Sequence, residues 1–352
     1  MKKIAVLAGD GVGPEVIAEA VKVLQVVDNK HRIGFDFKYN LIGACAIDAV
    51  GVPLPDETVA MCRSCDAVLL GAVGHPRFDR DPAAKVRPEQ GLLKIRKELG
   101  LFANIRPIKS YPTLYNASPL KVKLLEDVDF VVYRELTGGI YFGDKGRTNN
   151  GSQAFDLCSY SVEEITRIAR LALAAAQKRR QHLTLVDKAN VLETSRLWRE
   201  TLSKTLSDFP DVTFDCMYVD NAAMKLIQQP AFFDVILTEN MFGDILTDEA
   251  STITGSIGML PSASVGNTAA LFEPIHGSFP EGAGKGIANP MATILSAAMM
   301  LEHFGYTAAA REVTAAIDVA LQKGIVTAEI NPTQPKSTAE IGDFVASIIA
   351  EK

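Results

Sequence analysis

The sequence lacks the features of a membrane protein or an exported protein. No stretch approaches the ~20 apolar residues of a membrane span. The longest candidate begins at Met291 and is interrupted by Glu302 and His303. Only a few apolar residues precede Asp10, fewer than the core of a signal peptide requires. We therefore expect a cytoplasmic protein with no membrane partner.

Excess positive charge and paired cysteines are also missing. The chain has 36 Lys and Arg against 42 Asp and Glu, a net charge of −6, so nucleic acid is an unfavourable partner. An anionic small substrate must then meet locally clustered arginines. Five cysteines, an odd number, fit reduced thiols better than a disulfide framework. Cys62 and Cys65 form a CxxC, but no second Cys or His pair completes a metal site, so we expect two partly buried thiols.

The chain does contain a regular alternation of short apolar runs and amphipathic segments. With 352 residues, 47% of them hydrophobic and 22% charged, it is large enough for about two globular domains. The alternation predicts an α/β fold with a mainly parallel sheet. The expected strands are 3–9, 35–40, 67–73, 102–109, 128–135, 182–190, 213–220 and 232–239, and the expected helices include 14–30, 55–65 and 89–99.

Two segments break this alternation. The polar, glycine-rich segment 136–159 predicts a hairpin arm, and an arm of this length often packs on a partner chain. The segment 256–289 is rich in glycine and proline, and the chain after it is largely helical. Because these last helices have no strands of their own, we expect them to return and cover the first sheet.

The glycine-rich loop GDGVGPEV does not fit a dinucleotide-binding loop. Gly9, Gly11 and Gly13 alternate, whereas a Rossmann loop requires the spacing G-x-G-x-x-G. Pro14 is better explained as the first residue of a helix. Asp36 lies inside its extended run rather than at the end, so the usual ribose ligand is missing as well.

Three aspartates are candidates for binding a divalent cation. Asp244 and Asp248 are four residues apart and therefore share one helix face, and Asp220 follows another extended run. The first two are equally compatible with acids in a first helical turn, favoured by the helix dipole. Together, three carboxylates at strand-to-helix junctions favour Mg²⁺ or Mn²⁺, whose remaining ligands would be substrate and water.

Five further residues are candidates for substrate binding and proton transfer. Arg106 and Arg134 interrupt or end apolar runs, where an unpaired guanidinium is unfavourable, so a bound carboxylate is a reasonable partner. Arg96 lies on an expected helix. Tyr141 and Lys188 are possible proton carriers. Each of the five has a simpler explanation, as a solvated arginine, a packed tyrosine or a surface lysine.

These residues fall within motifs that resemble one enzyme family. The motifs are GDGVGPEV, RELTGGIYFG, DKANVL, YVDNAAM, TENMFGDILTDEAS and EPIHGSFPEGAGKGIANP. In this order and spacing the chain resembles the metal-dependent β-decarboxylating dehydrogenases, or isocitrate/isopropylmalate dehydrogenases, from Lys3 to about Ile349. The resemblance implies a non-Rossmann fold of two parallel or mixed-sheet domains, with a protruding dimerisation arm at 136–159. One domain would be 1–101 plus 255–352, with most of the NAD site, and the other 102–254, with the dimer interface and the metal and catalytic residues.

The resemblance also implies a role for individual residues. Tyr141 and Lys188 would be catalytic, and the metal would be held by Asp244 and Asp248 with Asp220 of the partner subunit, which also supplies Lys188. The substrate would meet Arg96, Arg106, Arg134, Asp220, Glu89, Leu92 and Leu93. The NAD⁺ contacts would be Val12, His276, Gly277, Ser278, Glu281, Ala283, Gly284 and Asn289.

The implied reaction is the NAD-dependent oxidative decarboxylation of (2R,3S)-3-isopropylmalate in leucine biosynthesis, by a homodimer with shared active sites. Leu92 and Leu93 would form an apolar wall for the isopropyl group, where relatives that bind isocitrate need a polar group. A related D-malate, tartrate or homoisocitrate dehydrogenase, or a non-catalytic regulatory subunit, are the alternatives. The chain departs from the family at Glu281 and Gly282, where an aspartate followed by a bulky aliphatic residue is common. A glutamate still accepts from both ribose hydroxyls and repels a 2′-phosphate, which favours NAD⁺ over NADP⁺.

Overall fold

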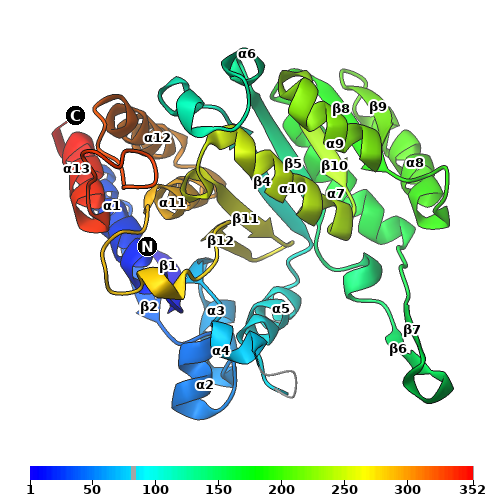
Figure 1. Cartoon of the computed structure of the whole chain (residues 1–352), viewed down its shortest axis with the longest axis horizontal. Coiled ribbons are helices and arrows are strands. Elements are labelled where there is room, and N and C mark those ends of the chain that lie inside the picture. The colour runs from blue at the N-terminus through cyan, green and yellow to red at the C-terminus, as the bar shows by residue number, and fades with distance from the viewer. Residues whose placement is uncertain (81–84, 352) are drawn as a thin grey trace. The chain divides into compact units, whose positions relative to one another are not determined.

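The computed structural model describes residues 1–80 and 85–351 (Figure 1). The chain divides into two compact units, which we call unit 1 (Met1–Leu101 and Ser256–Lys352) and unit 2 (Phe102–Gly255). Strands and helices alternate in both units, which confirms the expected α/β class. Over the described ranges, no helix combines the length and the apolar character needed to cross a bilayer.

Unit 1 contains a five-stranded part of the sheet in the order β2-β1-β3-β12-β11. β2, β1, β3 and β12 run parallel, and β11 is antiparallel to β12. The strands are β1 (Lys2–Gly9), β2 (Phe35–Tyr39), β3 (Ala67–Ala72), β11 (Pro261–Val265) and β12 (Ala270–Pro274). The last two lie in the glycine- and proline-rich segment 256–289 and are not among the expected strands. Their sequences, PSASV and ALFEP, contain proline and small residues in place of a β-branched run, so they give little strand signal.

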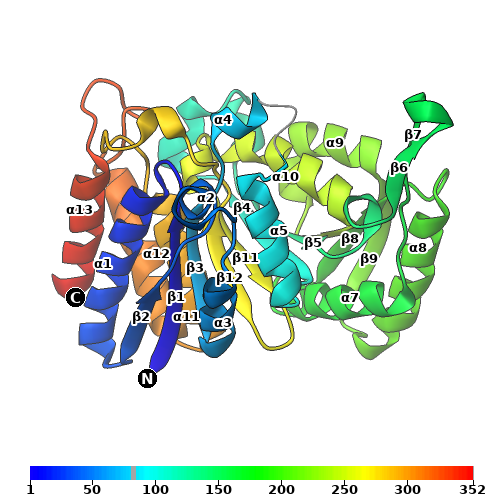
Figure 2. The same cartoon turned by 90° about the horizontal axis from the view of Figure 1, so that it is seen from below.

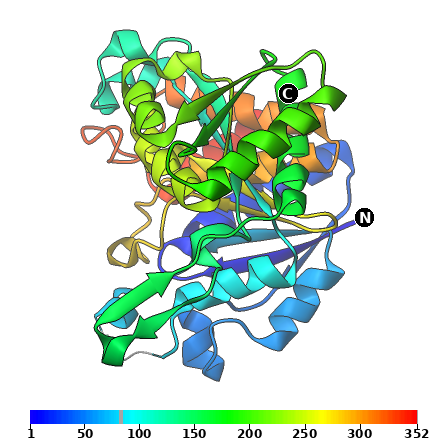
Figure 3. The same ribbon diagram turned by 90° about the vertical axis from the view of Figure 1, so that its right-hand side faces the viewer.

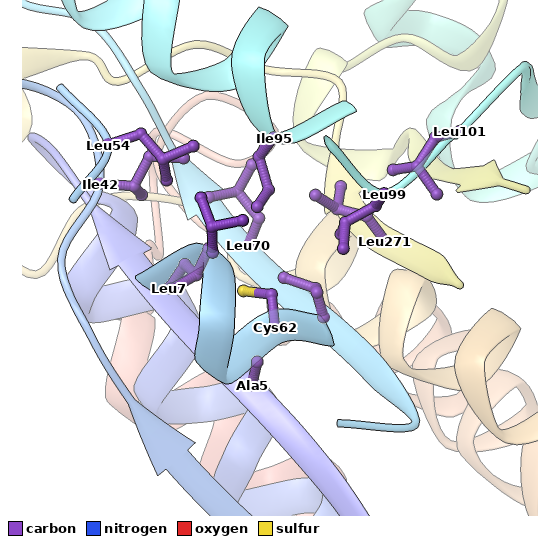
Figure 4. Close-up of a cluster of buried hydrophobic side chains, with 12 residues drawn as sticks. Ala5, Leu7, Ile42, Leu54, Cys62, Leu70, Ile95, Leu99, Leu101 and Leu271 are labelled. Carbon is purple, nitrogen blue, oxygen red and sulfur yellow. The ribbon is translucent and has the colours of Figure 1, made fainter. Parts of the chain in front are cut away.

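Helices cover both faces of this sheet. Ile4, Ala5, Val6 and Leu7 of β1 are all fully buried, as expected for a strand packed on both sides. On one side Ala5 and Leu7 contact Cys62, Ile95 and the other residues of a core cluster (Figure 4). On the other side α11 contacts β11 and β12, and α13 packs beside α1 (Figure 2). The expectation that the last helices cover the first sheet is therefore confirmed.

The helices of unit 1 begin and end close to the expected positions. Pro14 lies in the first turn of α1, which starts one residue earlier, at Gly13. Cys62 lies in the last turn of α3 and Cys65 follows that helix; all five cysteines are free thiols. The helices are α1 (Gly13–His31), α2 (Ala44–Val50), α3 (Asp56–Ser64), α4 (Pro76–Asp79), α5 (Pro88–Glu98), η6 (Ile257–Met259), η7 (Pro280–Gly282), α11 (Met291–His303), α12 (Thr307–Gln322) and α13 (Thr338–Glu351).

Unit 2 contains the strand order β4-β5-β10-β8-β9. Only β4 is antiparallel to its neighbour, so the carboxyl ends of β5, β10, β8 and β9 meet at one edge of the sheet. The strands are β4 (Ala103–Lys109), β5 (Asp129–Glu135), β8 (His182–Asp187), β9 (Thr213–Tyr218) and β10 (Val235–Thr238). The helices are η1 (Pro112–Ala117), α6 (Val122–Leu125), η2 (Gly139–Tyr141), α7 (Val162–Gln177), α8 (Glu193–Thr205), η4 (Leu206–Asp208), α9 (Val219–Gln228), η5 (Pro230–Phe232) and α10 (Asn240–Thr254).

The segment 136–159 forms the expected hairpin. β6 (Lys145–Thr148) pairs antiparallel with β7 (Gln153–Asp156), and η3 (Asn149–Gly151) makes the turn. The hairpin extends away from the sheet of unit 2 (Figure 3). Phe155 and Leu157 are exposed on it. What it packs against stays a prediction.

Candidate active site

The two acids of α10 are not first-turn acids. The helix begins at Asn240, so Asp244 is its fifth residue and Asp248 its ninth, and its first turn contains no acid. The interpretation that the helix dipole favours them is therefore wrong, because that effect fades beyond the first turn. Both carboxylates lie on the side of α10 that faces the arginines of β4 and β5.

Arg134, in β5, is buried and donates three hydrogen bonds to α10. Its Nη1 donates to Asp244 Oδ1 at 2.5 Å, and its Nε and Nη2 donate to Asn240 Oδ1 at 3.2 and 2.9 Å. Gly243 of α10 allows this close approach, since a Cβ there would lie 2.6 Å from the Arg134 Cγ. The sequence predicts a bound carboxylate as the partner of this arginine. The structure shows that the chain's own Asp244 already satisfies one edge of the guanidinium.

Arg106, in β4, has similar surroundings. Its Nε donates to Asn104 at 2.6 Å and its Nη1 to Thr247 Oγ1 at 2.6 Å. Asp248 lies 3.6 Å from Nη1 and Asp244 lies 3.9 Å from Nη2. Two buried guanidiniums therefore face two carboxylates. Partial burial, together with the charge of Asp244, raises the pKa of the Asp248 carboxyl, and Arg106 opposes the rise.

Tyr141 belongs to the same cluster. It ends η2, its side chain is 40% exposed, and its hydroxyl donates to Asp244 Oδ2 at 3.0 Å. It is therefore not a packed core tyrosine. Burial and the negative charge of Asp244 raise the pKa of the phenol. A phenol held in its protonated form beside a carboxylate is suited to donate a proton.

Lys188 and Asp220 form a second cluster in unit 2. Lys188 follows β8, and its Nζ donates to Asp220 Oδ1 at 2.5 Å. This hydrogen bond lowers the pKa of the Asp220 carboxyl. The sequence predicts Asp220 at the end of an extended run. In the structure it lies just beyond β9, in the first turn of α9. Among the described residues no three or more metal-binding side chains come together, so one chain does not unite Asp220 with Asp244 and Asp248.

Unit 1 carries the remaining predicted substrate residues on α5. Arg96 Nη2 donates to Glu273 of β12 at 2.7 Å, and its buried Nε has no hydrogen-bond partner among residues 1–80 and 85–351. Glu89 lies in the first turn of α5. Leu92 packs against the core cluster, and Leu93 is exposed.

Unit 1 also contains a cavity of about 330 Å³ beside the loop after β12. Four of the predicted cofactor residues line it, together with six that the sequence reasoning missed. The predicted ones are Val12, His276, Gly277 and Asn289, and the others are Ile257, Gly258, Phe279, Ile287, Ala288 and Glu329. Ser278, Glu281, Ala283 and Gly284 do not line this cavity. The wall is mostly apolar with a few polar groups, as in many ligand sites.

The polar groups of the cavity have defined orientations. Asn289 Nδ2 donates to Glu329 Oε1 at 3.1 Å, while its Oδ1 accepts from the N–H of Met291. His276 Nδ1 lies 3.0 Å from the carbonyl of Gly277, so Nδ1 carries the proton and Nε2 is an acceptor. That Nε2 is buried and has no partner in the described chain.

The glycine-rich loop has a packing role beside this cavity. Gly11 has φ +59°, and a Cβ there would overlap the carbonyl of Ser278. The next residue, Val12, donates its N–H to that same carbonyl at 2.8 Å. Glu15 of α1 accepts from the N–H groups of Gly284 and Gly286. The loop therefore holds the 276–286 segment in place, and it is not a phosphate-binding loop of the Rossmann type.

Asn240, in unit 2, is a further residue that the sequence reasoning missed. Besides accepting from Arg134, its Nδ2 donates to the carbonyl of Gly138, three residues before Tyr141, at 3.2 Å. The N–H of Gly138 donates to Glu135 at 2.7 Å, so this peptide is fixed at both ends. The motif TENMFGD contains Asn240. A single sequence gives no sign that its amide links Arg134 of β5 to the carbonyl of Gly138.

The fold and these clusters define an enzyme whose site combines acids, arginines and proton carriers. The sequence profile of the Isocitrate/isopropylmalate dehydrogenase family matches residues 3–345. A 3-isopropylmalate dehydrogenase of Moorella thermoacetica is 55% identical over 357 residues, covering 100% of both chains. One of Bacteroides fragilis is 52% identical over 349 residues, covering 99% of this chain and 98% of that one. The crystal structure of an isocitrate dehydrogenase from Methylococcus capsulatus superposes with a TM-score of 0.89 at 33% identity, covering 99% and 100%. The chain belongs to the isocitrate/isopropylmalate dehydrogenase family.

Proposed function

We propose that this chain catalyses the NAD⁺-dependent oxidative decarboxylation of (2R,3S)-3-isopropylmalate to 4-methyl-2-oxopentanoate and CO₂ in leucine biosynthesis, in the cytoplasm. The observation that carries the proposal is the cluster in unit 2 where Asp244 meets both Arg134 and Tyr141. Asp244 could bind a metal cation, Arg134 could bind a substrate carboxylate, and Tyr141 could donate a proton. Full-length similarity to relatives named 3-isopropylmalate dehydrogenase supports the same assignment.

Asp244 and Asp248 fit a divalent cation. They offer carboxylate oxygens on one helix face, and Asp248 retains an exposed side chain. Asp220 of the partner subunit would add a third carboxylate, with substrate and water completing the ligands. A cation held by these carboxylates would supply Lewis-acid chemistry, stabilising negative charge on the oxygen at C2.

The proton transfers would be carried out by Lys188 and Tyr141. Lys188 of the partner subunit would take the hydroxyl proton at C2, directly or through water, and bound NAD⁺ would supply the hydride acceptor. Arg96, Arg106 and Arg134 hold the two carboxylates of the malate. After the bond to the C3 carboxylate breaks and CO₂ leaves, Tyr141 delivers a proton to the enol carbon. Its hydroxyl donates to Asp244 Oδ2 at 3.0 Å, so the phenol lies beside an acid that would hold the cation.

The cavity in unit 1 fits the adenosine half of NAD⁺. His276, Gly277 and Asn289, from the loop that the resemblance assigns to the adenosine half, line it together with Val12. Gly277, Ser278, Ala283 and Gly284 would contact the coenzyme along the loop. Glu281 is exposed on that loop and would accept from the ribose hydroxyls.

Substrate choice would rest on α5. Leu93 is exposed and Leu92 partly so, which suits a hydrocarbon branch, with Glu89 one turn before them. A missing methyl group changes binding by only ~1–3 kcal/mol, so D-malate and tartrate are expected as minor substrates. Homoisocitrate, with a third carboxylate, is disfavoured by this apolar surface. A purely regulatory subunit would not need the complete set of proton carriers.

The active unit would be a homodimer. α9 and α10 pack together, and each presents an exposed apolar side chain, Met224 at 54% and Ile245 at 59%. An interface over these helices would bring Lys188 and Asp220 of one chain toward Asp244 of the other. Sedimentation of Met224→Lys should show monomers. Val50→Glu, equally exposed at 54% but in unit 1, is the matched control.

The decisive experiment is a substrate and coenzyme panel with the purified protein. NADH formation from 3-isopropylmalate should require Mg²⁺ or Mn²⁺ and stop when a chelator is added. Its specificity constant should exceed those for D-malate, tartrate and homoisocitrate, and NADP⁺ should be a poor substitute. Absence of metal-dependent NADH formation on 3-isopropylmalate would refute the proposal.

A further inference from the structure

The loop after β12 departs from the family pattern at the point where it borders the cavity. Glu281 is followed by Gly282, where a bulky aliphatic residue is common. Two positions before Glu281 stands Phe279, which lines the cavity. Phe279 and Gly282 are in direct contact.

The ring of Phe279 occupies the space that a side chain at 282 would need. A Cβ placed on Gly282 would lie 2.5 Å from Cδ1 of that ring and closer still to Cε1. Gly282 itself is buried, and its N–H donates to the Phe279 carbonyl at 3.0 Å. Because the two side chains would overlap, the chain can have a large residue at 279 or at 282 but not at both.

Phe279 is held in an unfavourable conformation. Its φ and ψ are 39° and 64°, in the left-handed region that bulky residues rarely adopt. Its side chain is 49% exposed although it is aromatic. Backbone strain and an uncovered aromatic ring together are typical of a ligand site, because the ligand covers what the folded chain leaves exposed.

We propose that the Phe279 ring is the wall against which the adenine of the nicotinamide coenzyme stacks, and that it replaces the aliphatic side chain missing at 282. The inference rests on the proposed function, since it takes NAD⁺ as the ligand. His276 lines the same cavity. Ile257 and Ile287 add apolar contact around the same cavity.

A double-mutant cycle tests this inference by calorimetric binding of NAD⁺ and of AMP. Phe279→Ala should weaken both about tenfold, the usual effect of one lost base–aromatic stack. Gly282→Ile should also weaken binding, because the new side chain displaces the ring. The double variant should bind better than Gly282→Ile and approach the wild type, since the isoleucine then has room to contact the base. Tyr39→Ala, which removes a ring that is 61% exposed elsewhere in unit 1, should bind like the wild type.

The result that overturns the inference is unchanged AMP binding by Phe279→Ala, or losses that simply add in the double variant. Phe279→Leu is a control for loss of loop structure in Phe279→Ala, because it keeps a large apolar side chain at this position. It should bind AMP more weakly than the wild type yet better than Phe279→Ala. If the wild-type protein binds neither NAD⁺ nor AMP, the coenzyme assignment is overturned as well. If the wild type binds both and Phe279→Ala binds them with the same affinity, only the role of the ring is overturned.

Discussion

Replacing Gly11 with alanine tests whether the glycine-rich loop acts through packing. Two penalties combine at this position. The φ of +59° costs an alanine about 1–2 kcal/mol. The new Cβ would also lie 2.7 Å from the carbonyl carbon of Ser278 and closer to its oxygen, and such overpacking costs about 1–3 kcal/mol.

The same change removes a hydrogen bond. The Val12 N–H donates to the Ser278 carbonyl at 2.8 Å, and moving the two loops apart loses about 1 kcal/mol more. We therefore expect Gly11→Ala to lower the free energy of unfolding by about 4 kcal/mol. NAD⁺ affinity should fall as well, because Val12 and His276 line one cavity.

Gly51→Ala is the matched control. Gly51 has φ +80° with nothing within 4 Å of its absent Cβ, so only the backbone penalty of about 1–2 kcal/mol applies. Urea denaturation followed by fluorescence compares the two variants, and calorimetry measures NAD⁺ binding. Equal destabilisation of both variants, with wild-type NAD⁺ affinity in Gly11→Ala, would refute the packing argument.

Four further outcomes are expected. Lys188→Ala should abolish hydride transfer but leave the dimer intact by sedimentation; unchanged turnover would remove its assigned role. In Tyr141→Phe the loss should fall on decarboxylation and enol protonation, so near-normal release of the keto acid contradicts the assignment. Asn240→Leu should raise the KM for 3-isopropylmalate about tenfold or more, because Arg134 loses two hydrogen bonds; an unchanged KM in a folded variant argues against this positioning role. Burial raises the pKa of the Cys62 thiol from 9.0 to about 12, so its contribution to stability is complete below pH 9 and is lost as the pH rises toward 12. The wild type should therefore lose stability over that range relative to Cys62→Ala, and parallel pH curves would contradict this.

The sequence determined most of the elements because their signals are local. β1 is a continuous apolar run, and such a run is what a strand buried on both faces requires. Asp244 and Asp248 share a helix face whatever surrounds them, because four residues make about one helical turn. The hairpin at 136–159 and the helix that begins at Val162 follow from glycine-rich and apolar-periodic segments in the same way.

Only the tertiary structure decided which residues of these helices and strands contact one another. Arg134 and Asp244 are 110 positions apart, and the parallel register of β5 and β10 brings them together. The strands β11 and β12 exist because a neighbouring sheet edge pairs with them, although their own residues favour strands weakly. Gly11 against Ser278, and Phe279 against Gly282, are contacts between backbone and side chains that no periodicity encodes. Local pattern therefore sets the helices and strands, and close packing of distant segments sets the site.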